Sequence, residues 1–345
     1  MKRILTPVAA LLAGTLCLAG SAVAKTYTMK IGFVTINDSN HLLANWQKKY
    51  LEEKSNGRLK VKVYPAAQLG KIPRQIEGVQ LGTQEAFHIP PGFFLGINKG
   101  LMVVDTPGLF DSIHHQSLAV NHPIVRDHFR TLAQKAGVIG NVLWSAGDTS
   151  VATVKPFKTL ADMRGRKIRV LATPLERAVM AKMGATGVPM PYSEVLPAMQ
   201  RNVVDGVRSG IIVMYPSKFY TAAKHVTLTQ QGQILCWQAL SIAWLKTLPA
   251  DLNKMIVTAG KLSTIHAARW GNDMTRQAEK DWAKVGSVYR LPAADQKKLR
   301  QLTSTIGDEI LGNDPKTKPT YELMKKAVVA TRGMELEAGL KKFLE

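Results

Sequence analysis

The clearest pattern in the chain is a strict alternation of polar and apolar residues in short segments that are followed by stretches with helical spacing. Residues 58–64, RLKVKVY, alternate without a break, which predicts a β-strand with one buried face that ends at Pro65. Residues 72–81 have the spacing of a helix, and Gly82 follows them as a common helix terminator. A strand and a helix thus follow one another within 25 residues.

The same reading extends along the chain and predicts an α/β fold. Strands are predicted at residues 26–34, 58–64, 86–89, 138–144, 150–154, 167–170, near 188 and at 203–205, and helices at 41–54, 72–81, from beyond 120 to 136, 174–183 and 193–201. Beyond Pro249 the chain is predicted to be nearly all helix, with breaks at 286–291 and 312–315. Strands that alternate with helices of this length favour parallel sheets with crossover helices. No internal repeat or flexible linker is present, so two lobes would have to be joined by strands or helices that cross between them.

The first 24 residues have the layout of a cleaved secretory signal peptide. Lys2 and Arg3 precede an apolar run from Ile4 to about Gly20, and Ala22-Val23-Ala24 forms a cleavage site before Lys25. The run is too short for a membrane span and contains Pro7. We therefore expect an exported protein in the periplasm.

Cysteine usage and charge further limit the kinds of protein this chain can be. Leu16 before Cys17 disfavours a lipid anchor, and the mature chain would keep only Cys236, so no intramolecular disulfide is expected. The chain has 46 Lys and Arg against 25 Asp and Glu, a formal charge of +21. The basic residues are spread along the sequence, which argues against a nucleic-acid site and favours a general field that steers small anions inward.

Motifs that would carry catalysis are missing from the sequence. No G-x-S-x-G, P-loop, G-x-G-x-x-G or H-E-x-x-H pattern occurs, and Cys236 has no partner cysteine. His114, His115, His122 and His128 are close in sequence, but no acidic spacing completes a metal site, so we interpret them as solvated helix residues. We expect neither an enzyme nor a protein with a metal or cofactor.

Arg169 is the most distinctive candidate for a binding residue. Residues 167–170, KIRV, are predicted as a strand, and alternation puts Lys167 and Arg169 on the face opposite Ile168 and Val170. An arginine late in a strand suits a sheet end that lines a cleft, where its planar guanidinium can hold a carboxylate through two parallel hydrogen bonds. The residues alone leave open a surface or ion-pairing role for Arg169.

An ordered set of short motifs resembles the extracytoplasmic solute-binding proteins of TRAP (tripartite ATP-independent periplasmic) transporters. The resemblance implies two α/β lobes joined by crossing strands and a long helix. It places residues 25–146 and about 235–275 in lobe I, and 147–234 and about 276–345 in lobe II. The motifs that carry it are Tyr64-Pro65 with Gln68-Leu69-Gly70, Gly165 with Lys167 to Val170, Gly184-Ala185 with Pro189-Met190, Ser193-Glu194-Val195 with Ala198-Met199-Gln200, Val204-Asp205-Gly206, Lys218-Phe219-Tyr220, and Trp244 with Leu248-Pro249.

The resemblance also implies a ligand site. Arg169 falls on the strand arginine that grips the substrate carboxylate, and Ser209 falls where an asparagine often binds the same group. Tyr192 falls where an aromatic ring packs on the substrate, although core packing at a helix start is an equal alternative. Trp144 and the segment Phe87 to Phe93, with His88 in it, are expected to shape the apolar part of the site.

Two departures from the family pattern bear on the ligand. Many members carry a second arginine near residues 147–150, where this chain has Gly-Asp-Thr-Ser with no cation. Asp148 and Thr149 are therefore site candidates, with Asp148 facing a cationic group of the ligand or capping a turn. The segment Phe87 to Phe93 is apolar with one histidine. Both features favour a monocarboxylate with an apolar or aromatic body.

The predicted function is capture of a small organic acid by closure of two lobes, followed by delivery to the membrane subunits of a TRAP-type transporter. A periplasmic sensor for a membrane receptor, a dicarboxylate binder, an enzyme on the same scaffold and a polyanion binder remain alternatives. We expect a monomer rather than a dimer.

Overall fold

A computed structural model describes residues 25–344 of the chain. The predicted signal peptide and Cys17 lie outside the described residues. The strands are β1 (Tyr27–Gly32), β2 (Leu59–Tyr64), β3 (Ala86–Ile89), β4 (Val138–Thr153), β5 (Lys167–Val170), β6 (Thr186–Pro189), β7 (Gly206–Gly210), β8 (His225–Ser241) and β9 (Ser287–Arg290).

Helices separate most of these strands. The α-helices are α1 (Ser39–Lys54), α2 (Ile72–Leu81), α3 (Ile113–Asn121), α4 (Pro123–Thr131), α5 (Pro174–Lys182), α6 (Tyr192–Gln200), α7 (Ile211–Met214), α8 (Ile242–Leu245), α9 (Ala250–Ala283), α10 (Ala293–Thr303), α11 (Lys318–Thr331) and α12 (Leu336–Leu344). Shorter helical turns are η1 (Pro91–Phe94), η2 (Lys99–Asp105), η3 (Gln134–Ala136), η4 (Leu160–Met163), η5 (Phe219–Thr221) and η6 (Asp308–Gly312).

The strands of residues 25–344 form one mixed sheet that runs through two lobes. Its order is β2-β1-β3-β8-β4-β7-β5-β6, with β9 paired to β8. Lobe I carries β1 to β3, in which β1 pairs in parallel with both β2 and β3. Lobe II carries β5 to β7, in which β5 pairs in parallel with both β6 and β7. The predicted two-lobed α/β architecture is confirmed.

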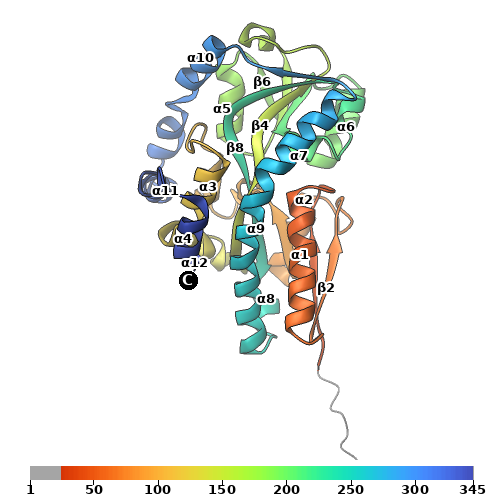
Figure 1. Cartoon of the computed structure of the whole chain (residues 1–345), viewed down its shortest axis with the longest axis vertical. Coiled ribbons are helices and arrows are strands. Elements are labelled where there is room, and N and C mark those ends of the chain that lie inside the picture. The colour runs from red at the N-terminus through yellow and green to blue at the C-terminus, as the bar shows by residue number, and fades with distance from the viewer. Residues whose placement is uncertain (1–24, 345) are drawn as a thin grey trace, which may run out of the picture.

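Two long strands and one long helix join the lobes. β4 and β8 pair antiparallel from Val138 opposite Ser241 to Thr153 opposite His225, with register shifts between Gly140 and Ser150. These irregularities increase twist and bend the ribbon where it passes from one lobe to the other. The 34-residue helix α9 runs beside both lobes (Figure 1). The predicted crossing strands and long helix are therefore present, while the predicted lobe boundaries stay a prediction.

Local sequence explains why the elements of lobe I form where they do. In β2, Leu59 and Val61 are buried while Lys60 and Lys62 are exposed, as the alternation requires. The side chain of Asp38 accepts hydrogen bonds from the backbone amides of Asn40 and His41 and so caps the start of α1. α2 ends at Gly82, whose φ of +82° is a left-handed conformation that glycine adopts without strain.

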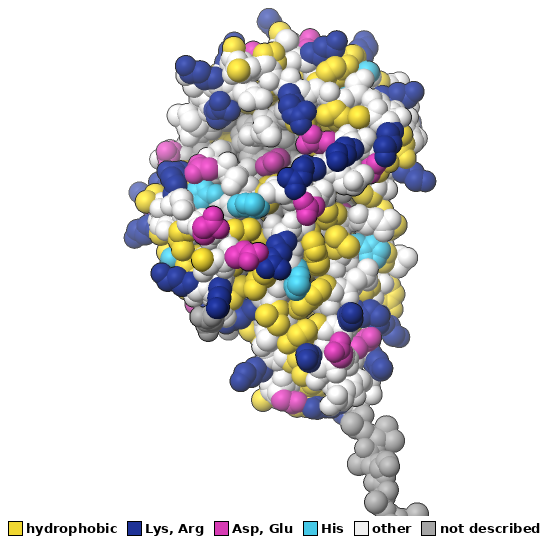
Figure 2. Space-filling view, in the orientation of Figure 1, with side chains coloured by type: hydrophobic (Ala, Val, Ile, Leu, Met, Phe, Trp, Pro, Cys, Tyr) yellow, Lys and Arg dark blue, Asp and Glu magenta, His cyan; other side chains and the backbone are white. Residues whose placement is uncertain are grey.

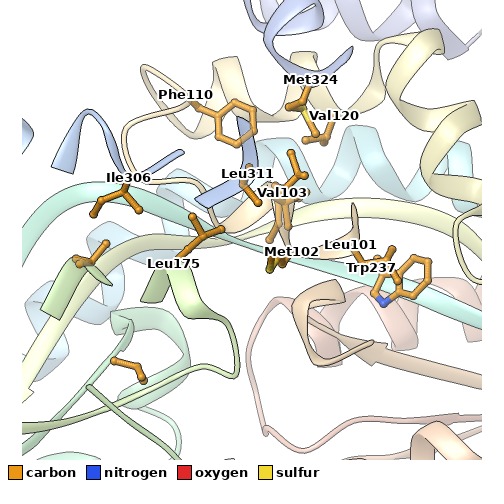
Figure 3. Packing of buried hydrophobic residues seen from close by; sticks show 14 of the residues in the cluster. Leu101, Met102, Val103, Phe110, Val120, Leu175, Trp237, Ile306, Leu311 and Met324 are labelled. Atoms are coloured by element: carbon orange, nitrogen blue, oxygen red, sulfur yellow. The ribbon is translucent and has the colours of Figure 1, made fainter. Parts of the chain in front are cut away.

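A large apolar cluster connects the sheet to the C-terminal helices. Leu101, Met102 and Val103 of η2 lie in it with Trp237 of β8 and Leu175 of α5, as Figure 3 shows. Phe110, Val120, Ile306, Leu311 and Met324 belong to the same cluster. Since its members come from segments more than 200 residues apart, tertiary packing holds this part of the fold together.

The structure differs from the predicted strands in three places. Residues 138–144 and 150–154 belong to the single strand β4, because Gly147 and its neighbours form irregularities in a continuous ladder rather than a loop. The 17-residue strand β8 was not predicted. Residues 203–205 are the turn before β7, where Val203 is half exposed and the side chain of Asp205 accepts from the backbone amide of Lys167.

The helical predictions need two corrections. The helix predicted to end at residue 136 consists of α4 and η3, with Pro123 separating α4 from the earlier α3. The predicted break at residues 286–291 contains β9, which extends the sheet beside β8.

The surface agrees with the spread of charge along the sequence. Figure 2 shows Lys and Arg side chains distributed over the visible face without forming one patch, while apolar side chains gather over α9 and α1. Among the helices within residues 25–344, none is both long and apolar enough to cross a bilayer.

Candidate functional site

A small cavity of about 40 Å³ lies between the two lobes beside the crossing strands. Its walls come from lobe I, from lobe II and from β4 and β8, so lobe movement would open it. The lining residues are Val34, Thr35, Asn40, Ile72, Ile89, Pro90 and Phe93 from lobe I, Arg169, Leu171, Tyr192, Ser209 and Val213 from lobe II, and Ala146, Ile234 and Cys236 from the crossing strands. Most of these side chains are apolar.

Arg169 supplies the positive charge of this cavity. Its side chain is 2% exposed, and both Nε and Nη2 donate to the backbone carbonyl of Met190, at 3.1 and 3.0 Å. Within the described chain no carboxylate forms an ion pair with Arg169, and its Nη1 has no acceptor. Burial lowers the pKa of Arg169 to about 10, so the guanidinium still carries its charge at neutral pH.

Tyr192 holds the guanidinium of Arg169 from one side. The centre of its ring lies 5.7 Å from Cζ of Arg169, a distance at which a cation and an aromatic face attract. The Tyr192 hydroxyl donates to the backbone carbonyl of Val213 at 3.0 Å, and its oxygen lies 2.8 Å from Oγ of Ser217, whose hydroxyl can donate to it. Tyr192 is both buried and part of the cavity wall. Core packing and cavity lining are therefore both true of this residue.

Polar atoms that lack protein partners also face this region. Ser209 lines the cavity, and its hydroxyl makes no hydrogen bond with the described residues. Asn40 donates from Nδ2 to Thr35 Oγ1 and to Asp38 Oδ2, while its buried Oδ1 has no partner there. The cavity thus combines one guanidinium with one hydroxyl that has no partner among residues 25–344, and the side chain of Asn40 adds an amide to its wall.

A second buried arginine lies close to this region but is neutralised. Arg208 on β7 is 3% exposed, its Nη1 donates to Oε1 of Glu176, and its Nη2 donates to Oε1 of Gln231 at 3.0 Å. Asp105 is a further buried carboxylate in the group, and burial together with the charge of Glu176 raises the pKa of Asp105 to about 8. Arg208 therefore cannot offer an uncompensated charge to a ligand.

The other predicted aromatic residues are placed differently. Phe93 lines the cavity, whereas Phe87, His88 and Trp144 lie outside its lining and are fully buried. His88 contacts Trp144 edge to face, accepts from Gln238 and donates to the backbone carbonyl of Asn40. Burial lowers the pKa of His88 to about 3, so it is neutral and supports the cavity wall from behind.

Asp148 and Thr149 are likewise outside the cavity lining. Oδ1 of Asp148 accepts from Nε2 of Gln233 at 3.0 Å, and burial raises the pKa of Asp148. The backbone carbonyl of Thr149 accepts from the hydroxyl of Thr229 at 2.9 Å. Both residues thus tie β4 to β8 in this conformation, and a ligand role for them stays a prediction.

Several lining residues were not identified from the sequence. Asn40 lies in the first turn of α1, one residue before the predicted helix start, while Ile234 and Cys236 lie on β8, which was not predicted. Burial raises the pKa of the Cys236 thiol, so it acts as an apolar wall residue.

The histidines in and between α3 and α4 have different surroundings. His115 is buried and its Nε2 is 2.9 Å from the backbone carbonyl of Val328, so the interpretation of this residue as solvated is wrong. His128 bonds to Oγ1 of Thr320. Residues 25–344 contain no group of three or more His, Cys, Asp or Glu side chains that could hold a metal ion.

Comparison with known sequences identifies the family. The profile of bacterial extracellular solute-binding protein family 7 matches residues 33–313. The chain belongs to this family of TRAP solute-binding proteins. It is 29% identical over 304 residues to the 2,3-diketo-L-gulonate-binding periplasmic protein of Escherichia coli, covering 88% of this chain and 89% of that protein. It is 27% identical over 315 residues to the C4-dicarboxylate-binding periplasmic protein of Rhodobacter capsulatus, covering 90% and 94%.

Solved structures of TRAP periplasmic solute-binding proteins share the fold. One from Desulfovibrio salexigens with bound orotic acid superposes with a TM-score of 0.83 at 22% identity, covering 89% of this chain and all of that one. The sugar acid binding protein of Advenella mimigardefordensis with galactonate gives 0.82 at 21% identity, covering 89% and 99%. The family consists of periplasmic substrate-binding transport proteins that take small organic acids and work with TRAP membrane subunits.

Proposed function

We propose that this protein captures a small monocarboxylate with an apolar or aromatic body and delivers it to the membrane subunits of a TRAP-type transporter. Its lobes close around the acid in the periplasm after removal of the signal peptide. It acts as a monomer, and its net positive charge attracts the anion without a dedicated nucleic-acid site.

The guanidinium of Arg169 carries this proposal. It is desolvated on the cavity wall, held by Met190 and Tyr192, and has one nitrogen with no acceptor. A buried charge without a partner is unfavourable, and a ligand carboxylate removes that cost through charge-assisted hydrogen bonds. Ser209 and Asn40 contribute polar atoms beside it.

The rest of the lining supports a single charge on the ligand. Arg208 is already bound by Glu176, and Arg169 is the one Arg or Lys that lines the cavity within residues 25–344. A second carboxylate would be buried against apolar groups such as Ile234 and Leu171, and an isolated ion is strongly disfavoured there.

A dicarboxylate is the second candidate ligand. The relative from Rhodobacter capsulatus is named for C4-dicarboxylates, and the fold is shared with a Shewanella oneidensis protein that holds succinate. If this chain bound such a ligand, either water or a rearranged Arg208 would have to compensate the second charge.

Closure follows from the position of the cavity between lobes. A ligand that contacts Arg169 in lobe II and Asn40 in lobe I binds the closed form better than the open form, and this difference alone shifts the equilibrium toward closure. Burial of the charge pair makes capture less sensitive to salt than binding at an exposed basic surface.

The decisive experiment is a thermal-shift screen of the mature protein with monocarboxylates, dicarboxylates and sugar acids, repeated on Arg169→Ala. An acid at about one hundred times its dissociation constant adds roughly 2.7 kcal/mol of stability and raises the melting temperature. We expect this rise for apolar monocarboxylates in the wild type and its loss in folded Arg169→Ala. Arg177→Ala removes the same charge from an exposed site on α5 and serves as the matched control.

Two results would contradict the proposal. A shift that survives Arg169→Ala would exclude carboxylate capture by this guanidinium. A shift with succinate that exceeds every monocarboxylate would favour the second candidate ligand, and a shift with galactonate that exceeds every apolar monocarboxylate would exclude the apolar body.

A further inference from the structure

A second, larger hollow opens next to the cavity at the seam between the lobes. It has a volume of about 430 Å³ and lies between α2, the η1 region and the end of β6. Ile76, Ile97 and Met190 are among its walls. We call this hollow the seam groove.

The seam groove adjoins the cavity that contains Arg169. Ile72 and Phe93 line both spaces, so these two side chains form the partition between them. Ile72 is buried, while Phe93 is only partly buried and packs against the edges of two apolar clusters. The backbone carbonyl that holds the Arg169 guanidinium belongs to Met190, whose residue also lines the groove.

The chemistry of the groove is almost purely apolar. Gln80 is the one polar side chain among its lining residues, and none of them carries a charge. A sugar hydroxyl or a second carboxylate would lose its hydration here without gaining a partner. A hydrocarbon chain would instead gain the free energy of leaving water.

We propose that the seam groove is a subsite for the hydrocarbon tail of the acid whose carboxylate binds Arg169. This inference rests on the proposed function and refines it, because it names the ligand class as medium-chain aliphatic or arylalkyl monocarboxylates. The cavity of about 40 Å³ accommodates little more than the carboxylate end of such a molecule. The tail passes between Ile72 and Phe93 and covers Ile76 and Ile97.

The shared walls favour a ligand tail over a protein segment as the occupant. A protein segment would have to cover the groove from outside, with backbone polar groups against a surface that offers only Gln80 as a partner. A tail attached to a bound carboxylate enters from the cavity side and brings no polar atoms with it.

The test is isothermal titration of the mature protein with butanoate, hexanoate, octanoate and decanoate, each kept below its micelle-forming concentration. Each methylene transferred from water to the groove should strengthen binding about fourfold, until the chain reaches the open end. Ile76→Asp and, independently, Ile97→Asp place a charge on the groove wall but outside the cavity lining. We expect each to weaken decanoate by at least about tenfold and butanoate by less than about twofold.

Val329→Asp is the matched control, because it adds the same charge at a 70% exposed position of α11. It should leave the whole length series unchanged. If one groove variant does not fold, the comparison is made with the other variant. The dependence of affinity on chain length is measured on the wild type and requires no variant.

The outcomes separate this inference from the proposed function. If butanoate binds in an Arg169-dependent manner and affinity does not rise with chain length, carboxylate capture stands and the tail subsite is wrong. A rise with length that both aspartate variants leave intact also excludes the groove. If none of the acids binds the wild type, or binding survives Arg169→Ala, the proposed function itself fails.

Discussion

Replacing Asp105 with asparagine should stabilise the protein at alkaline pH and leave it nearly unchanged at acidic pH. Asp105 ends η2 and is 8% exposed, and its Oδ2 has no hydrogen-bond partner among residues 25–344. Oδ2 also packs closely against Gly92, because a Cβ atom added to this glycine would lie only 2.5 Å from it. The carboxyl is thus confined, desolvated and close to the negative charge of Glu176.

The sign of the effect follows from the two protonation states. Burial and Glu176 raise the pKa of Asp105 to about 8, whereas the unfolded chain has the ordinary value near 3.8. Between these values the folded form binds a proton that the unfolded form has lost, so unfolding free energy falls as pH rises. Below about pH 4 both states are protonated and the group has no effect; above about pH 8 the full cost is present.

The magnitude is bounded by the difference in pKa. Each unit corresponds to about 1.4 kcal/mol, which gives an upper limit near 6 kcal/mol, and relaxation around Asp105 and Arg208 should reduce it to a few kcal/mol. An asparagine side chain resembles the protonated acid in shape and charge, so Asp105→Asn removes the pH-dependent cost. We therefore expect the variant to gain a few kcal/mol at about pH 9, roughly a quarter of that gain at about pH 5, and to match the wild type below about pH 4.

Urea unfolding at several pH values measures this difference directly. Asp127→Asn is the matched control, because it makes the same change on an exposed side chain of α4. Equal stabilisation at both pH values, or destabilisation of Asp105→Asn at alkaline pH, would refute the interpretation of Asp105 as a buried proton-binding carboxyl.

Two further predictions concern the cleft. Tyr192→Phe loses two hydrogen bonds but keeps the ring against Arg169, so it should cost about 1 kcal/mol of stability by urea unfolding and change acid affinity less than Tyr192→Ala does. Affinity that falls equally in both variants would contradict a role for the ring. Lys71 and Glu194 form an exposed ion pair of 2.8 Å between α2 and α6, across the lobes. Glu194→Gln should weaken acid binding by less than about fivefold at low salt and not at all at high salt, by titration calorimetry.

The fold could be predicted from the sequence where local signals and tertiary packing agree. β2 has one buried face, so its alternation is visible, and α2 is bounded by a proline-containing first turn and Gly82. β8 has no such signal, because it is buried on both faces over most of its length and contains the polar run Gln230 to Gln233. Its pairing with β4 joins residues up to about one hundred positions apart, which local patterns do not encode.

The site was predictable to a similar extent. Arg169, Tyr192 and Ser209 were predicted from their strand position and from the family resemblance, and the structure brings all three to one cavity. Phe87 and Trp144 were predicted from their apolar character, which also suits the core in which they are found. Apolar character alone does not separate a cavity wall from the layer behind it, since the difference depends on which way each strand residue faces.

The contrast between the two buried arginines bears most directly on the ligand. Arg208 and Arg169 come from adjacent parallel strands and are almost equally buried, yet only Arg208 has a carboxylate partner. A protein that needed a neutral cavity could have paired both, because a buried unpaired guanidinium lowers stability. In the proposed function, the charge of Arg169 is a cost to the ligand-free protein that one ligand carboxylate removes. A second carboxylate would then leave an uncompensated negative charge in the closed cavity, which is why we propose a monoanion.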